Sequence, residues 1–364
     1  MKVLSIVLGV FLILSTLMDA SRTLVTTRRG NRRFTASQLF YRNTWRIWLT
    51  IGARIKNENS RQSFLGSFGP LSLIGLLVAW VSVLVVGWGF VWWGVRADLD
   101  GVDNLIDGIY YSGVTFFTLG YGDIVPTGGG ERLLAVLEAF LGLGIVALVI
   151  GFLPTLYGAY SRREVQLGLL DDLSHRTTPV GLIAHCYRQG GLDRLYATFR
   201  DWEHWCADVF DSHTAYPMLM LFRSRQPGQS WLTALGVVLD AAAQTIAVVP
   251  DAATREPALL YRRALRTLDA LSGVGQEIRG PRGLPPLDPV PDDEASFRTG
   301  FDRLVGAGVP TRPFADAWAD IQRLRLPYDN VLRAFVTVLL VEPDFRSNAP
   351  AVLPETSGPA PGDG

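Results

Sequence analysis

Three long apolar runs constrain this chain more than any other feature of its sequence. Residues 3–18 and 62–95 carry no charged side chain, and residues 133–160 carry one, Glu138. A helix needs about 20 apolar residues to cross the hydrocarbon core of a membrane. The second and third runs reach that length, and the first is slightly short. The sequence therefore predicts an all-α membrane protein.

The first run has two interpretations. Lys2 precedes an apolar core and "LMDA" resembles a signal-peptide cleavage site, which favours removal of the run. Residues 20–62, however, hold ten arginine and lysine side chains, and such a segment should stay cytoplasmic. We therefore expect residues 1–20 to be an N-terminal transmembrane anchor and 21–69 to be a basic cytoplasmic segment, with a cleaved signal as the alternative.

The same rule orients the other two runs. Residues 71–95, an outer helix, then cross outward, and residues 131–157, an inner helix, return to Arg162 and Arg163 on the cytoplasmic side. We expect a multi-pass protein of the plasma membrane with its N-terminus outside. Residues 96–131 then lie on the outer side, and the C-terminal domain is cytoplasmic.

The outer segment is too apolar for an ordinary loop. Residues 103–117 are typical of a short helix that Asp103 or Asn104 can cap. The triplet Gly120-Tyr121-Gly122 that follows suits neither a helix interior nor a strand. Irregular backbone at membrane depth is tolerated only where protein buries it or water lines it. A re-entrant pore loop, with an extended part at 118–123, satisfies that condition.

The sequence "TLGYGD" at 118–123 resembles the selectivity-filter signature of potassium channels. The resemblance extends over residues 70–157 and includes the outer helix, "IYYSGVTFFT" and a glycine-containing inner helix. It implies a pore domain of two spans and a re-entrant loop. It also implies that K+ binds along a filter formed by Thr118, Leu119, Gly120, Tyr121 and Gly122. Two residues depart from the family: Leu119 replaces the commonest valine, and Val114 replaces a glutamate that some members pair with the following aspartate.

The residue types of the filter have physical reasons. A dehydrated K+ ion needs oxygen ligands, and backbone carbonyls supply them if all of them face one axis. Gly120 and Gly122 permit the alternation of left- and right-handed conformations that this requires. We expect Tyr121 to pack outward against Tyr110 and Tyr111. Carboxylates on the outer side, with Asp123 at the mouth, should raise the local cation concentration: Asp98, Asp100, Asp103, Asp107 and Asp123.

One chain carries one such loop, whereas a ring of ligands needs four, so we expect a homotetramer. Alignment with the inner helix of the family directs Leu143, Val146 and Ile150 toward the cavity. The same helix holds residues that allow bending or close packing: Gly142, Gly144, Gly151 and Pro154. The sequence leaves open whether these glycines form a gating hinge or only permit close packing.

Glu138 is an ionisable residue inside a span, which makes it a candidate for function. Its register directs it behind the filter, so we expect a protonated or hydrogen-bonded side chain near Ser112 or Thr115. Together with Tyr110, Tyr111 and Thr115 it forms the expected support of the filter. The alternative is a side chain that snorkels to the outer interface.

Most of the remaining chain is predicted to be helical. Residues 40–55 are basic and amphipathic, which fits either a helix on the inner leaflet or an ordinary surface helix. Residues 230–250 are apolar but include Asp240 and Gln244, which favours a buried core helix over a span. The expected organisation is an all-α cytoplasmic domain at 158–280, a proline-rich linker at 281–296, a helical part at 297–345 and a disordered tail at 346–364.

Other classes of function find little support. The formal net charge is zero, so nucleic acid is not an expected partner. "GVGQEIRG" lacks the third glycine of a nucleotide-binding turn, and no nucleophile–base pattern suggests an enzyme. His185, Cys186, His204 and Cys206 lie near one another in sequence, but without the usual zinc spacing. We therefore expect no cofactor and no metal beyond permeant K+.

The sequence thus predicts a potassium-selective channel whose partners are further copies of itself and membrane lipid. One alternative is a weakly selective cation channel. Another is a membrane-tethered sensor that binds a ligand through its helical cytoplasmic domain.

Overall fold

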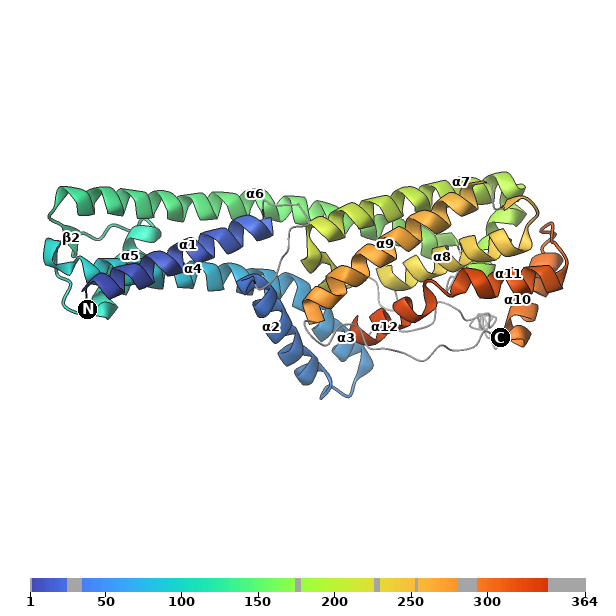
Figure 1. Cartoon of the computed structure of the whole chain (residues 1–364), viewed down its shortest axis with the longest axis horizontal. Helices are drawn as coiled ribbons and strands as arrows, with labels where there is room; N and C mark the ends of the chain where they lie inside the picture. The colour runs from blue at the N-terminus through green and yellow to red at the C-terminus, as the bar shows by residue number, and fades with distance from the viewer. Residues whose placement is uncertain are drawn as a thin grey trace, which may run out of the picture. The chain divides into compact units, whose positions relative to one another are not determined.

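The computed structural model describes residues 2–24, 35–173, 178–225, 230–252, 255–279 and 293–339. These residues are helical nearly throughout, and four of their helices are long and apolar enough to span a membrane (Figure 1). The predicted all-α membrane fold is therefore confirmed. The arginine-rich stretch at 25–34, most of the expected linker at 281–296 and the expected tail at 346–364 lie outside the described residues.

The chain divides into two compact units. The first is formed mainly by Met1–Ser161 and Ser212–Arg223, and the second mainly by Arg162–Asp211, Ser224–Gln276 and the C-terminal part of the chain. The expected division into a pore domain and a cytoplasmic helical domain put the boundary near residue 157. The structure differs in one respect, because Ser212–Arg223 belongs to the first unit although the residues on either side of it belong to the second.

In the first unit, α1 (Lys2–Leu24) packs along α4 (Phe68–Gly94) (Figure 1). Glycines allow the two backbones to approach closely. A Cβ atom added to Gly9 would lie 2.4 Å from the Gly87 carbonyl oxygen, and one added to Gly94 would lie 2.4 Å from Ile6. The Ser5 hydroxyl also donates to the Phe90 carbonyl at 2.6 Å. These contacts make the first apolar run part of the packed unit.

A buried carboxylate, Asp19, joins α1 to two other helices. It accepts hydrogen bonds from the Ser37 backbone N–H at 3.0 Å and from the Trp80 indole N–H at 2.9 Å. Ser37 lies at the start of α2 (Ala36–Gly52), and Trp80 lies in α4. Sequence reasoning missed this junction, since a carboxylate at the end of an apolar run resembles an ordinary boundary residue.

The helix α2 buries one face against the foot of α4. Trp45 packs against Phe68 with ring centroids 4.8 Å apart, and Trp48 stacks on Phe64 of α3 (Glu58–Gly66) at 4.5 Å. The opposite face exposes apolar side chains, namely Leu39, Ile47 and Ile51. The amphipathic pattern predicted over 40–55 thus corresponds to a helix that is half packed and half exposed.

The returning segment Ser212–Arg223 completes the first unit. It contains the short helix η2 (Pro217–Leu221), and the Tyr41 hydroxyl lies 3.6 Å from the Met218 sulfur. The Phe222 ring lies so close to Gly69 that an added Cβ would meet it at 2.7 Å. Tyr216 lies edge-on to Phe152 with centroids 5.4 Å apart. The segment therefore contacts the helix that follows the pore loop as well as α2 and α4.

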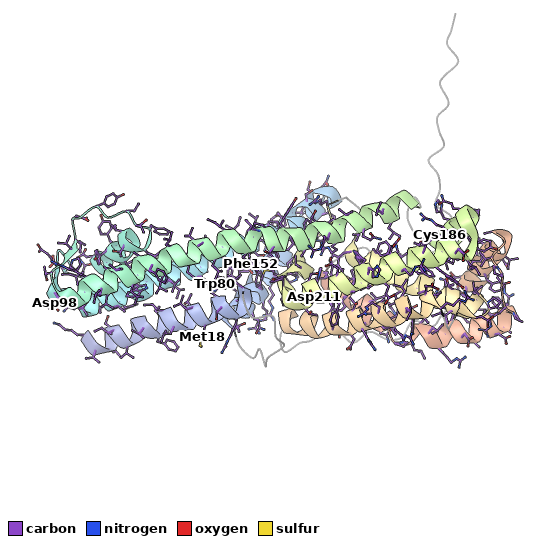
Figure 2. All side chains as sticks on the ribbon, turned by 90° about the horizontal axis from the view of Figure 1, so that it is seen from above. Met18, Trp80, Asp98, Phe152, Cys186 and Asp211 are labelled. Carbon is purple, nitrogen blue, oxygen red and sulfur yellow. The ribbon has the colours of Figure 1, made fainter. Side chains whose placement is uncertain are left out.

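The helix that follows the pore loop, α6 (Gly129–Leu173), is continuous. It extends beyond residue 157, where the inner helix was expected to end. Pro154 lies inside α6 without ending it, because proline removes only one hydrogen bond and its neighbours keep theirs. In Figure 2, the labelled Phe152 on α6 and Asp98 beyond α4 lie toward opposite ends of this unit.

The second unit is a helical bundle around α8 (Trp231–Val248). Its other helices are α7 (Pro179–Ala215), which is interrupted at Gly190 and Gly191, and the helices α9 (Glu256–Arg279), α10 (Glu294–Gly306), α11 (Phe314–Arg325) and α12 (Asp329–Leu339). Nearly every residue of α8 is buried by this bundle. That supports the prediction of a core helix, although α8 is also long and apolar enough for a span.

Asp240, the charge inside α8, is fully paired. The Arg325 guanidinium donates to both carboxylate oxygens at 2.7 and 2.8 Å, and the Tyr328 hydroxyl donates at 2.6 Å. Burial by itself raises the pKa of Asp240, but the Arg325 charge and the hydrogen bonds outweigh it and hold the pKa below its ordinary value. A buried ion pair offsets the cost of removing its charges from water only when its geometry is good and further hydrogen bonds are made, and Asp240 meets both conditions.

His185, Cys186, His204 and Cys206, which lie near one another in sequence, do not gather into a metal site. Cys186 and Cys206 are fully buried, whereas His204 is exposed. Among the residues that the structure describes, no group of three or more His, Cys, Asp or Glu side chains is arranged to hold a metal ion. Burial raises the pKa of both thiols, which favours the neutral form over the thiolate that binds metals.

Candidate functional site: the pore loop and its supports

The pore loop begins with a well-capped helix, α5 (Leu105–Phe116). The Asn104 side chain accepts from the backbone N–H groups of Ile106 at 2.8 Å and Asp107 at 3.2 Å. The Asp107 carboxylate returns the bond to the Asn104 N–H at 3.0 Å. Asn104 rather than Asp103 is thus the cap, and α5 is slightly shorter than the predicted 103–117. The capping hydrogen bonds fix where α5 starts. Its C-terminal end leads directly into the segment that follows.

The backbone of that segment alternates in handedness. Thr118, Gly120 and Gly122 have positive φ angles of 57°, 62° and 79°. The φ angles of Leu119 and Tyr121, between them, are negative. Such alternation turns successive carbonyl groups toward one side of the chain. Sequence reasoning anticipated it for the two glycines and missed Thr118, since a positive φ is rare at a β-branched residue. A strained residue of this kind often marks a functional site.

Two backbone hydrogen bonds join the segment to α5. The Leu119 N–H donates to the Val114 carbonyl at 2.8 Å, and the Thr118 N–H donates to the Thr115 carbonyl at 3.0 Å. Thr115, predicted as a support of the filter, therefore contacts residue 118 through its backbone. All residues from 117 to 123 are exposed in the single subunit.

The C-terminal end of the alternating segment is held by Tyr110. Its hydroxyl donates to the Asp123 carboxylate at 2.8 Å. Val114 cannot bond to Asp123, but the tyrosine one turn earlier on α5 can. Asp123 is therefore tied to the pore helix in spite of the apolar residue at 114.

The expected packing of Tyr121 against Tyr110 and Tyr111 stays a prediction. Tyr121 is 67% exposed. Tyr111 lies edge-on to Trp92 of α4 with centroids 5.0 Å apart. Both tyrosines of α5 are thus already engaged, one by Asp123 and the other by the outer helix, and the ring of Tyr121 remains uncovered within the chain.

Glu138 is buried behind α5 and is hydrogen-bonded at both oxygens. Oε1 lies 2.5 Å from the Ser112 hydroxyl, and Oε2 accepts from the Trp92 indole N–H at 2.6 Å. The carboxyl of α6 is thereby joined to the pore helix and to the outer helix at once. This placement agrees with the expected hydrogen bond near Ser112 and does not fit a side chain that snorkels to the interface. The role of Trp92 was not anticipated.

A small antiparallel ladder closes the outer end of the loop. The strand β1 (Leu99–Asp100), which follows the short helix η1 (Arg96–Asp98), pairs with β2 (Val125–Pro126). The Thr127 hydroxyl also donates to the Asp98 carbonyl at 2.8 Å. The ladder was not predicted, because two-residue strands leave no periodic pattern in the sequence.

The face of α6 that was expected to line the cavity is uncovered in the single subunit. Leu143, Val146 and Ile150 are all exposed. A Cβ added to Gly142 would lie 2.2 Å from the Phe116 carbonyl oxygen, whereas nothing lies within 4 Å of one added to Gly144 or Gly151. Close packing therefore explains Gly142 alone, and the other two glycines, like Pro154, lie on open surface.

Residues 78–157 match the family model described as ion channel. This part of the chain is therefore similar to an ion-channel domain. The matched residues run from the middle of α4 through α5 and the alternating segment into α6.

Curated relatives are distant and cover parts of the chain. The membrane protein YdjJ of Bacillus subtilis is 25% identical over 199 residues, which are 53% of this chain and 58% of YdjJ. The two pore potassium channel a of Oryza sativa is 29% identical over 27% of each chain. The protein LctB of Geobacillus stearothermophilus is 29% identical over 22% of this chain and 69% of its own.

The chain thus spans only part of these relatives, and the first two are matched over less than two thirds of their length. No solved structure matches the chain significantly.

Proposed function

We propose that this protein is a potassium-selective channel that conducts K+ passively through a pore formed by four copies of the chain. The observation that carries the proposal is the alternating backbone at Thr118, Gly120 and Gly122, within a sequence that ends in Gly-Tyr-Gly-Asp. An alternating backbone presents a row of carbonyl oxygens, and such a row can replace the hydration shell of K+. The rice relative, which is named a potassium channel, supports the same ion.

The surface that one subunit leaves uncovered supports the proposal of a tetramer. A single row of carbonyls cannot enclose an ion, whereas four rows about an axis can. The residues that a fourfold pore would need on its axis are exposed in the single chain: Thr118, Leu119, Gly120, Tyr121 and Gly122 in the filter, and Leu143, Val146 and Ile150 along α6. Neighbouring copies would also cover the ring of Tyr121.

The proposed topology puts Asp123 at the outer mouth of a plasma-membrane protein and the second unit in the cytoplasm. It rests on the arginines between the first two runs and at 162 and 163. Within that arrangement the C-terminal end of α5 is directed at the ion path, where its partial negative charge favours a cation.

The test is a measurement of reversal potential in vesicles that contain the purified protein, with K+ on one side and Na+ on the other. We expect a potential near the K+ equilibrium value. Gly120→Ala should abolish the current, since a side chain in the left-handed conformation costs about 1–2 kcal/mol per residue. Gly130→Ala is the matched control, because that glycine has open space and an ordinary φ.

A potential near zero with current present would instead make the protein a weakly selective cation channel. Current that survives Gly120→Ala with unchanged selectivity would contradict the assignment of the filter.

A further inference from the structure

The returning segment Ser212–Arg223 is attached to the second unit at both ends, while its middle packs in the first unit. Before its middle, α7 continues as a helix up to Ala215. Directly after it, the Ser224 hydroxyl accepts from the Trp231 backbone N–H at 3.1 Å, where α8 begins. Because α8 is buried along nearly its whole length, the ends of the returning segment move with the second unit.

The middle of the returning segment is strongly buried. From Met218 to Phe222 no side chain is more than 9% exposed. The Phe222 ring lies against the first turn of α4, because a Cβ added to Gly69 would be 2.7 Å from its Cδ2 atom. The same ring lies 5.7 Å from the ring of Tyr160 on α6, centroid to centroid. Phe222 therefore fills the space between the foot of α4 and α6.

On α6 the returning segment contacts the side of the helix that faces away from the proposed pore axis. Phe152, which lies edge-on to Tyr216, follows two residues after the exposed Ile150. With 3.6 residues in a helical turn, these two α6 side chains point to nearly opposite sides of the helix. The Tyr160 hydroxyl also donates to the Arg223 carbonyl at 3.1 Å. The returning segment is thus a spacer behind the pore-lining face of α6.

The part of α6 that meets this spacer is also the part that bends most easily. Pro154 lacks the N–H for one backbone hydrogen bond, and Gly151 has open space around it. With the spacer in place, residues 151–161 of α6 cannot move toward α4. Without it, the same residues are free to bend away from the pore axis.

We propose that the returning segment is a mechanical link through which the second unit controls the width of the pore. With Phe222 between α4 and α6, residues 151–161 stay near the axis and the pore is narrow. When the second unit withdraws the ring, α6 moves toward α4 and the pore widens. The inference rests on the proposed pore of four copies and does not depend on which cation that pore selects.

The first measurement is the distance between spin labels on α4 and α6 in the full-length protein. Leu71→Cys and Leu153→Cys place the labels at side chains that are 49% and 50% exposed. The native Cys186 and Cys206 are buried and should stay unlabelled. Dilution with unlabelled protein leaves one labelled chain in each assembly. We expect Phe222→Ala to shift the distance to shorter values, since no ring then separates the two helices.

The second measurement is the fraction of time for which single channels conduct in a planar bilayer. Phe222→Ala should raise this open fraction by roughly fivefold or more, within the range that is typical of coupling between distant sites. Gly69→Ala should lower the open fraction, because its methyl group pushes the Phe222 ring toward α6.

Two residues of α3 provide matched controls. Leu65→Ala also truncates a fully buried side chain of the first unit, and should lower the melting temperature without changing the label distance or the open fraction. Gly66→Ala adds a methyl group where nothing lies within 4 Å, and should change none of these quantities.

Asp240→Asn tests whether the second unit acts through this link. It leaves Arg325 without its partner and loosens α8, at whose start the returning segment is attached. We expect it to shorten the label distance in the wild-type background and to have no further effect in Phe222→Ala protein.

Three results would overturn the proposal. The first is a label distance that is equal in wild-type and Phe222→Ala protein. The second is a shortened distance with an unchanged open fraction, which would make the segment a packing element only. The third is full additivity of Asp240→Asn and Phe222→Ala, since the second unit would then act by another route. Current without K+ selectivity would contradict the proposed function alone, because neither measurement depends on selectivity.

Discussion

At the scale of single residues, the membrane part of the chain pairs its buried carboxyl groups with donors from other helices. Glu138 joins α6 to Ser112 and Trp92. Asp19 joins α1 to α2 and α4. Such groups are costly to bury alone and strongly directional once paired. Each therefore specifies how three helices meet, which apolar packing alone does less sharply.

The first prediction concerns Glu138. Glu138→Ala leaves the Ser112 hydroxyl and the Trp92 N–H without partners, and should destabilise the subunit by about 2–5 kcal/mol in a thermal melt. Glu138→Gln should restore most of that loss, because its amide oxygen can accept from Trp92 and its amide nitrogen can donate to Ser112.

Glu131→Gln, which alters a glutamate in the first turn of the same helix, is the control for Glu138. A Glu138→Ala protein as stable as wild type, with unchanged conduction, would remove the carboxyl from the support of the filter.

The second prediction concerns the tie at the outer mouth. Tyr110→Phe removes the hydrogen bond to Asp123 and keeps the ring, and because this bond is exposed to solvent in the subunit we expect little change in the stability of the fold. We expect the conducting state to decay faster during sustained recording, because the outer end of the filter is then less restrained.

Tyr111→Phe, which lies next to Tyr110 and faces Trp92, should not reproduce that decay. In an Asp123→Asn background the effect of Tyr110→Phe should shrink. If the effects of Tyr110→Phe and Asp123→Asn on the decay of the current simply add, the hydrogen bond between the two side chains does not contribute to the function.

At the scale of elements, glycine does two different things on α6. At Gly142 it allows the helix to touch the last carbonyl of α5, whereas Gly144 and Gly151 have free space around them. Proline at 154 lies within the same continuous helix. The packing role of one glycine and the uncovered position of the others can thus be separated by substitution.

We predict that Gly142→Ala and Gly144→Ala change the stability of the subunit in opposite directions. Gly142→Ala places a methyl group 2.2 Å from the Phe116 carbonyl oxygen, and should lower the melting temperature and disturb conduction. Gly144→Ala meets nothing in the chain, and the better helix propensity of alanine is worth up to about 1 kcal/mol. Equal melting temperatures for the two variants would contradict the close approach of α5 and α6.

At the scale of the whole molecule, the chain consists of two units that rely on different chemistry. The first is built on glycine-mediated contacts and a few buried carboxyls. The second surrounds α8 with other helices and pairs Asp240 with Arg325. The two units should therefore respond differently to acid.

We predict that acid weakens the second unit through Asp240. Its pKa is lower in the folded state, so the stabilisation is present above the unfolded value of about 3.9 and is lost as pH falls through the folded pKa. Asp240→Asn should destabilise this unit at neutral pH by about 3–5 kcal/mol, because Arg325 is left buried without its partner. Amide hydrogen exchange of α8 measures both effects.

The exposed pair of Arg298 and Glu294 provides the control, since its loss should cost less than about 1 kcal/mol. If the protection of the α8 amides, measured relative to an unfolded chain at the same pH, is equal at neutral and acid pH, the role given to Asp240 is contradicted.

The sequence by itself determined much of the pore loop. Apolar run length predicted α1, α4 and α6, and polar residues at the right spacing predicted the cap of α5 at 103 or 104. The two glycines predicted a left-handed backbone at 120 and 122. These features depend on local rules, in which each residue restricts its own conformation or that of its near neighbours.

Only the tertiary structure decided what depends on partners distant in the chain. It brought Trp92 and Ser112 to Glu138, tied Asp19 to Trp80, joined Tyr110 to Asp123 and returned Ser212–Arg223 to the foot of α4. A side chain does not encode which distant donor it will meet, because that depends on how whole helices pack. The local conformations could thus be predicted from the sequence, whereas the pairing of buried polar groups appeared only once the helices were assembled.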